Sequence, residues 1–215
     1  MEKAVDVHSA AIAARFLAIA AEEGGGITNL KLQKLVTLAQ SLNLFRHGSR
    51  LFVEDVQAWK NGPAIKPLYG MYKRFKQSPI SAIDDSWKSR EDIDKSSVAV
   101  IDEVWRVAGD LSASELWKLT HESGPWKDRY LPDVSDIVIP IEDLSNAWPA
   151  YKHRAQTMSG KAPAAPSAVD FSTVEVSASD AALTPVVGYG QHGFKDFDEY
   201  KRARSLLLGH VSRES

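Results

Sequence analysis

Residues 24–67 read GGGITNLKLQKLVTLAQSLNLFRHGSRLFVEDVQAWKNGPAIKP, and this stretch has the most regular pattern in the chain. Three glycines lead into Thr28, a residue type that caps helix N-termini, and apolar residues at helical spacing follow. The spacing predicts a helix that runs to about His47. Ile27 and Leu32 are spaced as a hydrophobic staple, which fixes the angle at which the chain enters a helix.

This helix is expected to have two faces. At 100° per residue its apolar side chains gather on one broad arc: Leu32, Leu35, Val36, Leu38, Ala39, Leu42 and Phe45. A polar row falls opposite them: Gln33, Thr37, Gln40 and Ser41. The pattern therefore predicts an amphipathic helix whose polar row faces solvent. Beyond it, Leu51–Trp59 alternates roughly and favours a short strand or extended arm, and Asn61-Gly62-Pro63 is typical of a turn.

The composition is that of a soluble globular protein, with 44% hydrophobic and 25% charged residues among 215. A net charge of −2 argues against a generally basic nucleic-acid binder, although a local basic patch is compatible with it. The chain has no cysteine, which excludes disulfides, thiolate nucleophiles and cysteine-ligated metals within it. Because this composition suits a reducing compartment, we expect a cytoplasmic protein.

One apolar segment, Ala10–Ala21, resembles a targeting signal. It is too short to span a bilayer, Arg15 interrupts it, and the acidic residues before it do not suit a signal peptide. We interpret it as part of a core helix over about Val7–Glu22 and expect no membrane association.

Further helices are predicted downstream. They are Pro67–Gln77, a segment around Val98–Ala108, a helix opened by the capping box Ser112-Ala-Ser-Glu115 and stopped by Gly124-Pro125, and Ile141–Arg154, interrupted near Pro149. Asp136–Pro140 favours a short strand. The expected fold class is mainly α: a compact helical domain with one or two short β segments.

The composition changes after Met158. Ser159–Pro185 is rich in alanine, serine and proline, which predicts a flexible linker. The segment Phe194–His210 then has the spacing of an amphipathic helix. We therefore expect a helical domain over residues 1–155, a linker over 156–193 and a C-terminal amphipathic segment over 194–215.

Catalytic and ligand-binding motifs are weak. Gly188-Tyr-Gly190-Gln-His-Gly193 has the letters of the dinucleotide fingerprint, but it follows the linker and not a strand. His121-Glu122 lacks the second histidine of a zinc-binding helix, because Pro125 occupies that position. The acidic residues between 84 and 94 are interpreted as a solvated loop. We expect no catalytic residue, no metal and no cofactor, and a protein that is not an enzyme.

The tryptophans allow two interpretations. Trp59, Trp105 and Trp126 are candidates for the core. Alternatively, Trp59 and Trp126, each beside a proline turn, lie near the surface and anchor a protein partner.

Three stretches together resemble the Panacea domain, a family that includes phage-associated proteins and the antitoxin SocA. They are ITNLKLQKLVTLAQ (27–40), LFVEDVQAWKNGPAIKPLYGMYKRF (51–75) and LWKLTHESGPW (116–126). The resemblance covers roughly residues 8–150. Two departures are mild: Ala64 stands where the family often has valine, and Thr37 where an aromatic residue is frequent.

The resemblance implies a non-enzymatic antitoxin that neutralises a cognate toxin by direct binding. Its SocA branch further implies a proteolytic adaptor that delivers the toxin to the ClpXP protease. We expect these residues to bind the partner: Gln33, Lys34, Thr37, Gln40, Trp59, Gly62, Pro63, Tyr69 and Trp126. The alternative is a DNA-binding regulator of its own operon, with a basic face formed by Lys31, Lys34, Lys66, Lys73, Arg74 and Lys76.

Overall fold

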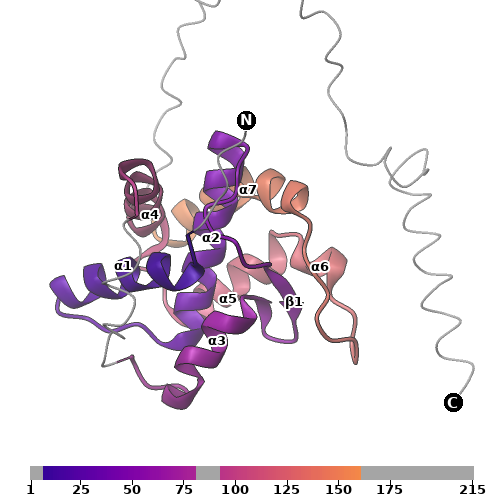
Figure 1. The fold of residues 1–215 in the computed structure, drawn as a ribbon, viewed down its shortest axis with the longest axis horizontal. Helices are drawn as coiled ribbons and strands as arrows, with labels where there is room; N and C mark the ends of the chain where they lie inside the picture. Colours follow the sequence, from indigo (N-terminus) through magenta and orange to yellow (C-terminus); the bar gives the residue numbers. More distant parts are fainter. Residues whose placement is uncertain (1–6, 81–92, 161–215) are drawn as a thin grey trace, which may run out of the picture. The chain divides into compact units, whose positions relative to one another are not determined.

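The structure, a computed structural model, describes residues 7–80 and 93–160 and is mostly helical, as the sequence predicts (Figure 1). Its elements are α1 (Ser9–Glu22), α2 (Asn29–His47), β1 (Gln57–Trp59), β2 (Gly62–Ala64), α3 (Lys66–Tyr72), the 3₁₀ turn η1 (Lys73–Phe75), α4 (Lys95–Ala108), α5 (Ala113–Glu122), α6 (Trp126–Arg129) and α7 (Ile141–Met158). The Gly188–Gly193 motif, the C-terminal segment, most of the predicted linker and most of the acidic loop lie outside the described residues.

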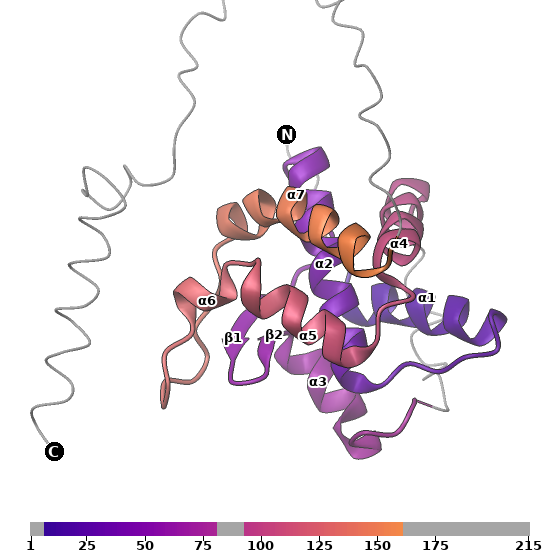
Figure 2. The same cartoon turned by 180° about the vertical axis from the view of Figure 1, so that it is seen from behind.

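Helix α2 runs through the centre of the domain, and α1, α4, α5 and α7 pack around it (Figures 1 and 2). The predicted start is confirmed: the Thr28 side chain accepts a hydrogen bond from the Lys31 backbone N–H at 3.3 Å, and Ile27 and Leu32 are both buried. The helix ends at Gly48, whose left-handed φ of 66° suits glycine.

The solvent-facing polar row predicted for α2 is wrong. Gln33, Thr37, Gln40 and Ser41 are all buried, as is every side chain from Leu32 to Leu44. Phe45, which we assigned to the buried arc, is instead 54% exposed in the last turn. The helix is covered on all sides, because the chain between α2 and α3 crosses the side that the pattern left for water.

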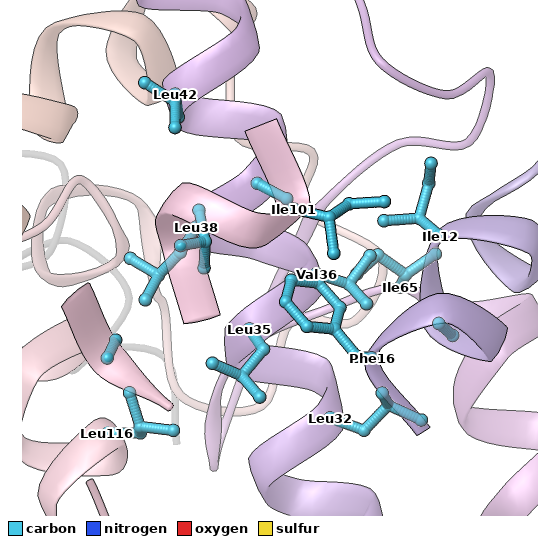
Figure 3. Packing of buried hydrophobic residues seen from close by; sticks show 14 of the residues in the cluster. Ile12, Phe16, Leu32, Leu35, Val36, Leu38, Leu42, Ile65, Ile101 and Leu116 are labelled. Carbon is cyan, nitrogen blue, oxygen red and sulfur yellow. The ribbon is translucent and has the colours of Figure 1, made fainter. Parts of the chain in front are cut away.

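The core gathers apolar side chains from several helices around α2. Ile12 and Phe16 of α1 meet Leu32 and Val36 of α2, with Ile101 of α4 beside them (Figure 3). Each fully buried side chain of this size stabilises the fold by about 1.5–3 kcal/mol relative to exposure. Within residues 7–80 and 93–160, no helix has both the length and the apolar character needed to cross a bilayer.

Strands β1 and β2 form a short antiparallel hairpin in which Gln57 pairs with Ala64 and Trp59 with Gly62. The strand predicted from Leu51 is therefore confined to its last three residues. On the other edge of β1, the Ala58 N–H donates to the Ile137 carbonyl at 2.8 Å. Together with the Ile139 N–H, which donates to the Val56 carbonyl at 2.8 Å, this contact pairs Val138 with Gln57. The strand predicted over Asp136–Pro140 is therefore reduced to a single bridge, and Asp136 has a left-handed φ of 61°.

Several helix boundaries differ from the predictions. Helix α3 ends at Tyr72, and the predicted continuation to Gln77 is replaced by η1. The interruption predicted at Pro149 is wrong, because α7 continues through it to Met158. Pro149 is exposed while its neighbour Trp148 is buried, so core packing on the inner face holds the helix together across the missing N–H. Residues 156–158, which we assigned to the linker, belong to α7.

Candidate functional site

Two glutamines of α2 bind the backbone of the segment that crosses the helix. Gln40 Oε1 accepts a hydrogen bond from the Leu51 N–H, and Gln33 Oε1 accepts one from the Ile65 N–H, both at 2.8 Å. The Thr37 hydroxyl donates to the Gln33 carbonyl at 2.9 Å within the helix itself. These buried polar groups are therefore satisfied, and they fix residues 51–65 against α2.

Lys34 is a buried cation that holds the tip of the hairpin. Its Nζ donates to the Asn61 carbonyl at 2.7 Å and to the Pro63 carbonyl at 2.9 Å. Burial lowers the pKa of Lys34 to about 7, since removing the ammonium from water disfavours its charged form. The outer edge of β2 thus receives its hydrogen bonds from a helix side chain in place of a neighbouring strand.

Gly62 lies in direct contact with α2 and α5. It has a φ of 93°, and a Cβ at this position would lie 2.6 Å from both Lys34 Nζ and His121 Cε1. Such distances are too short for carbon contacts, so only glycine fits here without movement of its neighbours. The hairpin tip is therefore closely packed between the lysine and the histidine.

Six aromatic side chains, here called the aromatic surface, form two groups of ring contacts: Trp59 with Tyr69, and Trp117, His121, Trp126 and Tyr130. The Trp59 and Tyr69 rings meet edge to face with centroids 5.1 Å apart. Trp126 Nε1 donates to the Trp59 carbonyl at 2.6 Å, which joins α6 to the hairpin. Tyr69 is 41% exposed and Trp117 38%, so the cluster reaches solvent at both ends.

His121 lies inside this cluster between two tryptophans. Its ring centroid is 3.9 Å from that of Trp117 and 3.8 Å from that of Trp126. Because a carbonyl only accepts, the 2.7 Å contact between His121 Nδ1 and the Trp117 carbonyl places a proton on Nδ1. Burial lowers the pKa of His121, and the nearby Lys34 ammonium lowers it further, while hydrogen bonds with backbone groups of Trp117 and Lys60 oppose the shift. The ring is therefore neutral at pH 7 and acts as a packing element.

An open pocket of about 560 Å³ adjoins the aromatic surface. It is lined by Ala58, Trp59, Lys60, Lys66, Tyr130, Asp133, Val134, Ser135 and Asp136. Lys66 Nζ lies 2.9 Å from Asp136 Oδ1, so an ion pair forms part of its wall. In the part of the chain that the structure describes, no three carboxylate or imidazole groups lie close enough together to hold a metal ion.

The nine residues predicted to bind a partner divide by burial. Three present surface to solvent: Trp59, Tyr69 and Trp126. Six are buried: Gln33, Lys34, Thr37 and Gln40 in α2, and Gly62 and Pro63 in the hairpin. In this fold the six buried residues belong to the hairpin or hold it in place. Contact between any of the nine residues and a partner stays a prediction.

The two interpretations of the tryptophans are answered by their placement. Trp59, Trp105 and Trp126 are all partly buried at the edge of the core, whereas Trp148 is buried inside it. The interpretation of Trp59 and Trp126 as side chains near the surface is therefore the better one.

Sequence reasoning missed Trp117, Tyr130 and Lys60, which belong to the same region. Trp117 and His121 are four residues apart on one helix, a spacing that would have signalled their contact. Tyr130 stacks on Trp126 with centroids 4.9 Å apart, four residues along the chain but across the end of α6.

The basic face expected for DNA binding loses two of its six members. Lys34 is buried, and Lys31 Nζ donates to the Gly109 carbonyl at 2.6 Å while lying over the Trp105 ring. Of the remaining four, Lys66 lies in α3, Lys73 and Arg74 lie in η1, and Lys76 directly follows η1.

A comparison with protein families finds one similarity. Residues 32–127 match the family model described as Antitoxin SocA-like, Panacea domain. The matched range includes α2, the hairpin, α3, α4 and α5, and therefore all of the aromatic surface except Tyr130. No curated protein and no solved structure matches the chain. The family match supports an antitoxin role in general terms. Residues 32–127, a little under half of the chain, are therefore similar to the Panacea domain of SocA-like antitoxins.

Proposed function

We propose that this protein is an antitoxin that neutralises a cognate toxin by binding it directly, without catalysing a reaction. The observation that carries the proposal is the aromatic surface, held in place by the hairpin within the matched antitoxin domain. Tryptophan and tyrosine dominate the energetics of protein interfaces, because they supply large contact areas with few rotatable bonds.

The aromatic surface is fixed before any partner arrives. Trp59 Nε1 donates to Gln57 Oε1 at 2.8 Å, and Trp126 is held by its bond to the Trp59 carbonyl. Ordering a long side chain on binding costs about 0.5–1.5 kcal/mol, so a surface whose rings are already held loses less affinity in this way. This arrangement supports a binding role for the cluster.

The polar groups beside the cluster also support binding over catalysis. Lys34 donates to two backbone carbonyls, and His121 donates its Nδ1 proton to a third. A general base needs a free nitrogen within reach of a substrate, and a nucleophilic lysine needs access to one. Lys34 is instead buried in structural hydrogen bonds, and the second nitrogen of His121, Nε2, makes no hydrogen bond in the described residues but is buried away from solvent.

Direct neutralisation is tested with the protein encoded beside this one. That protein should arrest growth when expressed alone and should copurify with the antitoxin when both are expressed. Tyr69→Ala should weaken the complex by about 1–2 kcal/mol, or roughly 5–30-fold in Kd, because it removes an exposed aromatic ring from the surface. Phe45→Ala is the matched control, since Phe45 is also an exposed aromatic residue but lies outside the aromatic surface. A neighbouring protein that is harmless, or that binds neither form, refutes the proposal.

We further propose that the antitoxin delivers its bound toxin to the ClpXP protease. This finer proposal rests on the likeness to SocA. It predicts that the toxin has a shorter half-life in cells with both the antitoxin and ClpXP than in cells that lack either one. A toxin half-life that does not depend on ClpXP would leave blocking by direct binding as the mechanism.

A further inference from the structure

Positive charge is concentrated in one segment of the chain. Residues 56–80 contain no aspartate or glutamate and five basic residues: Lys60, Lys66, Lys73, Arg74 and Lys76. The whole chain carries 26 basic and 28 acidic residues, so its excess of acid lies entirely outside this segment. All five basic side chains are exposed.

Three of the basic residues, Lys66, Lys73 and Arg74, share a face with Tyr69 on α3 and η1, and Lys76 directly follows η1. Lys66, Tyr69, Gly70, Lys73 and Arg74 recur at steps of three and four residues through α3 and η1, and all are exposed. Leu68 and Tyr72 are buried on the opposite face. We call these five exposed residues the basic stripe.

The basic stripe continues onto the hairpin. The Tyr69 ring contacts Trp59, which directly precedes Lys60 at the hairpin turn. Figure 2 shows α3 beside the hairpin, so the two elements present a joined surface. This surface includes part of the aromatic surface together with the five cations.

Little of this charge is neutralised within the described residues. Lys66 pairs with Asp136 at 2.9 Å. The Arg74 guanidinium lies 5.0 Å from the centre of the Phe75 ring, a contact that leaves its charge in place. In residues 7–80 and 93–160, no carboxylate lies within ion-pair distance of Lys60, Lys73 or Arg74.

We propose that the basic stripe docks an acidic surface of the toxin, with carboxylates of the toxin placed around Tyr69 and Gly70. This inference rests on the proposed function. An aromatic residue at the centre with charges at the rim is the usual arrangement of a protein interface. The rim charges would accelerate association, and Gly70 would let a side chain of the partner approach the helix backbone.

The shape of the stripe favours a protein over DNA. A recognition helix enters the major groove as the second helix of a helix-turn-helix pair. Helix α3 has only seven residues, follows a β-hairpin and ends in a 3₁₀ turn. Among the cations, Tyr69 is exposed beside Gly70. A tyrosine next to a glycine suits contact with a pocket or ridge on the surface of a folded protein better than contact with a DNA groove.

Gly70 offers a matched pair of substitutions. A Cβ at Gly70 would meet no atom within 4 Å, and its φ is not in the left-handed region, so the fold accommodates a side chain there. Glutamate and lysine have similar lengths and similar helix propensities, and they differ mainly in charge. Gly70→Glu and Gly70→Lys therefore separate the effect of charge from that of bulk.

The test is the Kd and association rate for the purified toxin at 50 and 500 mM NaCl. Gly70→Glu should bind about tenfold more weakly than Gly70→Lys at low salt, mainly through slower association, and the difference should shrink at high salt. Lys95→Glu at an exposed position of α4 changes the net charge by two, the same difference that separates Gly70→Lys from Gly70→Glu, and should leave the Kd unchanged.

Three results would overturn the inference. Equal weakening by both Gly70 variants would mean that only bulk matters, and no weakening by either would place the toxin elsewhere. The stripe would be assigned to DNA if the unmodified protein binds the DNA duplex upstream of its operon and Gly70→Glu abolishes that binding while toxin binding stays intact. Failure of the unmodified protein to bind the toxin would instead refute the proposed function itself.

Discussion

Substitution of Gly62 by alanine should destabilise the protein by about 3–6 kcal/mol, a large part of the stability of an ordinary domain. The change adds a single methyl group at the tip of the hairpin, where the backbone has a φ of 93°. It therefore tests whether the hairpin packs on Lys34 and His121 as closely as the structure indicates.

The magnitude has two parts. A left-handed backbone costs a residue with a Cβ about 1–2 kcal/mol relative to glycine. The new Cβ would also lie 2.6 Å from Lys34 Nζ and from His121 Cε1, so at least one of them has to move. Moving Lys34 strains its bonds to the Asn61 and Pro63 carbonyls, and overpacking together with a lost buried hydrogen bond costs about 2–4 kcal/mol.

Gly48→Ala is the control for the first part. Gly48 also has a left-handed φ, at 66°, but a Cβ there would meet nothing within 4 Å. This variant should lose only about 1–2 kcal/mol. Urea unfolding followed by tryptophan fluorescence gives both values from the midpoints, provided that the two m-values agree. Equal destabilisation by the two variants would refute the packing of Gly62 against the lysine and histidine.

Three further predictions concern buried groups and helix α3. The pKa of Lys34 is about 7 in the folded protein and 10.5 in the unfolded chain, so between these pH values the unfolded state binds more protons. The free energy of unfolding should therefore rise with pH across this window, by up to about 5 kcal/mol. Lys34→Met has no titrating group at this position and lacks that rise. In urea titrations, the free energy of unfolding of the variant minus that of the unmodified protein should therefore fall between pH 7 and pH 9.5. A difference that stays constant with pH would contradict the lowered pKa of Lys34. Gly124→Ala should destabilise by about 1–3 kcal/mol in thermal unfolding, because its Cβ would overlap the Tyr151 hydroxyl and the ring carbons Cζ and Cε1. Tyr151→Phe removes only the hydroxyl, so the double variant should recover part of that loss, and no recovery at all would contradict the contact. Gly70→Ala should stabilise by about 0.5–1 kcal/mol, seen as a higher Tm, since it replaces an exposed glycine within α3; a lower Tm would mean that the Cβ is not free of contacts.

Much of the fold follows from signals that act over a few residues. The Thr28 cap, the Ile27–Leu32 staple and the Ser112–Glu115 capping box all occur where the sequence predicts them. Each is a contact between residues three to five positions apart, so its geometry is set once the helix forms. The positions of the main helices could be predicted for this reason, apart from shifts of a few residues at their ends.

The candidate site was only partly predictable. Trp59, Tyr69 and Trp126, which we expected to bind a partner from a resemblance and from their proximity to turns, lie in the aromatic surface, and their contact with a partner stays a prediction. That Trp126 bonds to the Trp59 carbonyl, 67 positions away, is visible only in the folded chain. The same holds for the joining of the basic stripe to the hairpin through Tyr69.

The sequence by itself determined that residues 29–47 form a helix capped by Thr28, and that its apolar arc, apart from Phe45, lies in the core. Only the tertiary structure decided that the opposite side is buried as well. Periodicity records which side chains are apolar, but burial of a polar side chain depends on whether a distant backbone supplies its hydrogen bonds. Here the backbone of residues 51–65 binds Gln33, Lys34 and Gln40, so this row holds the hairpin in place and does not face solvent.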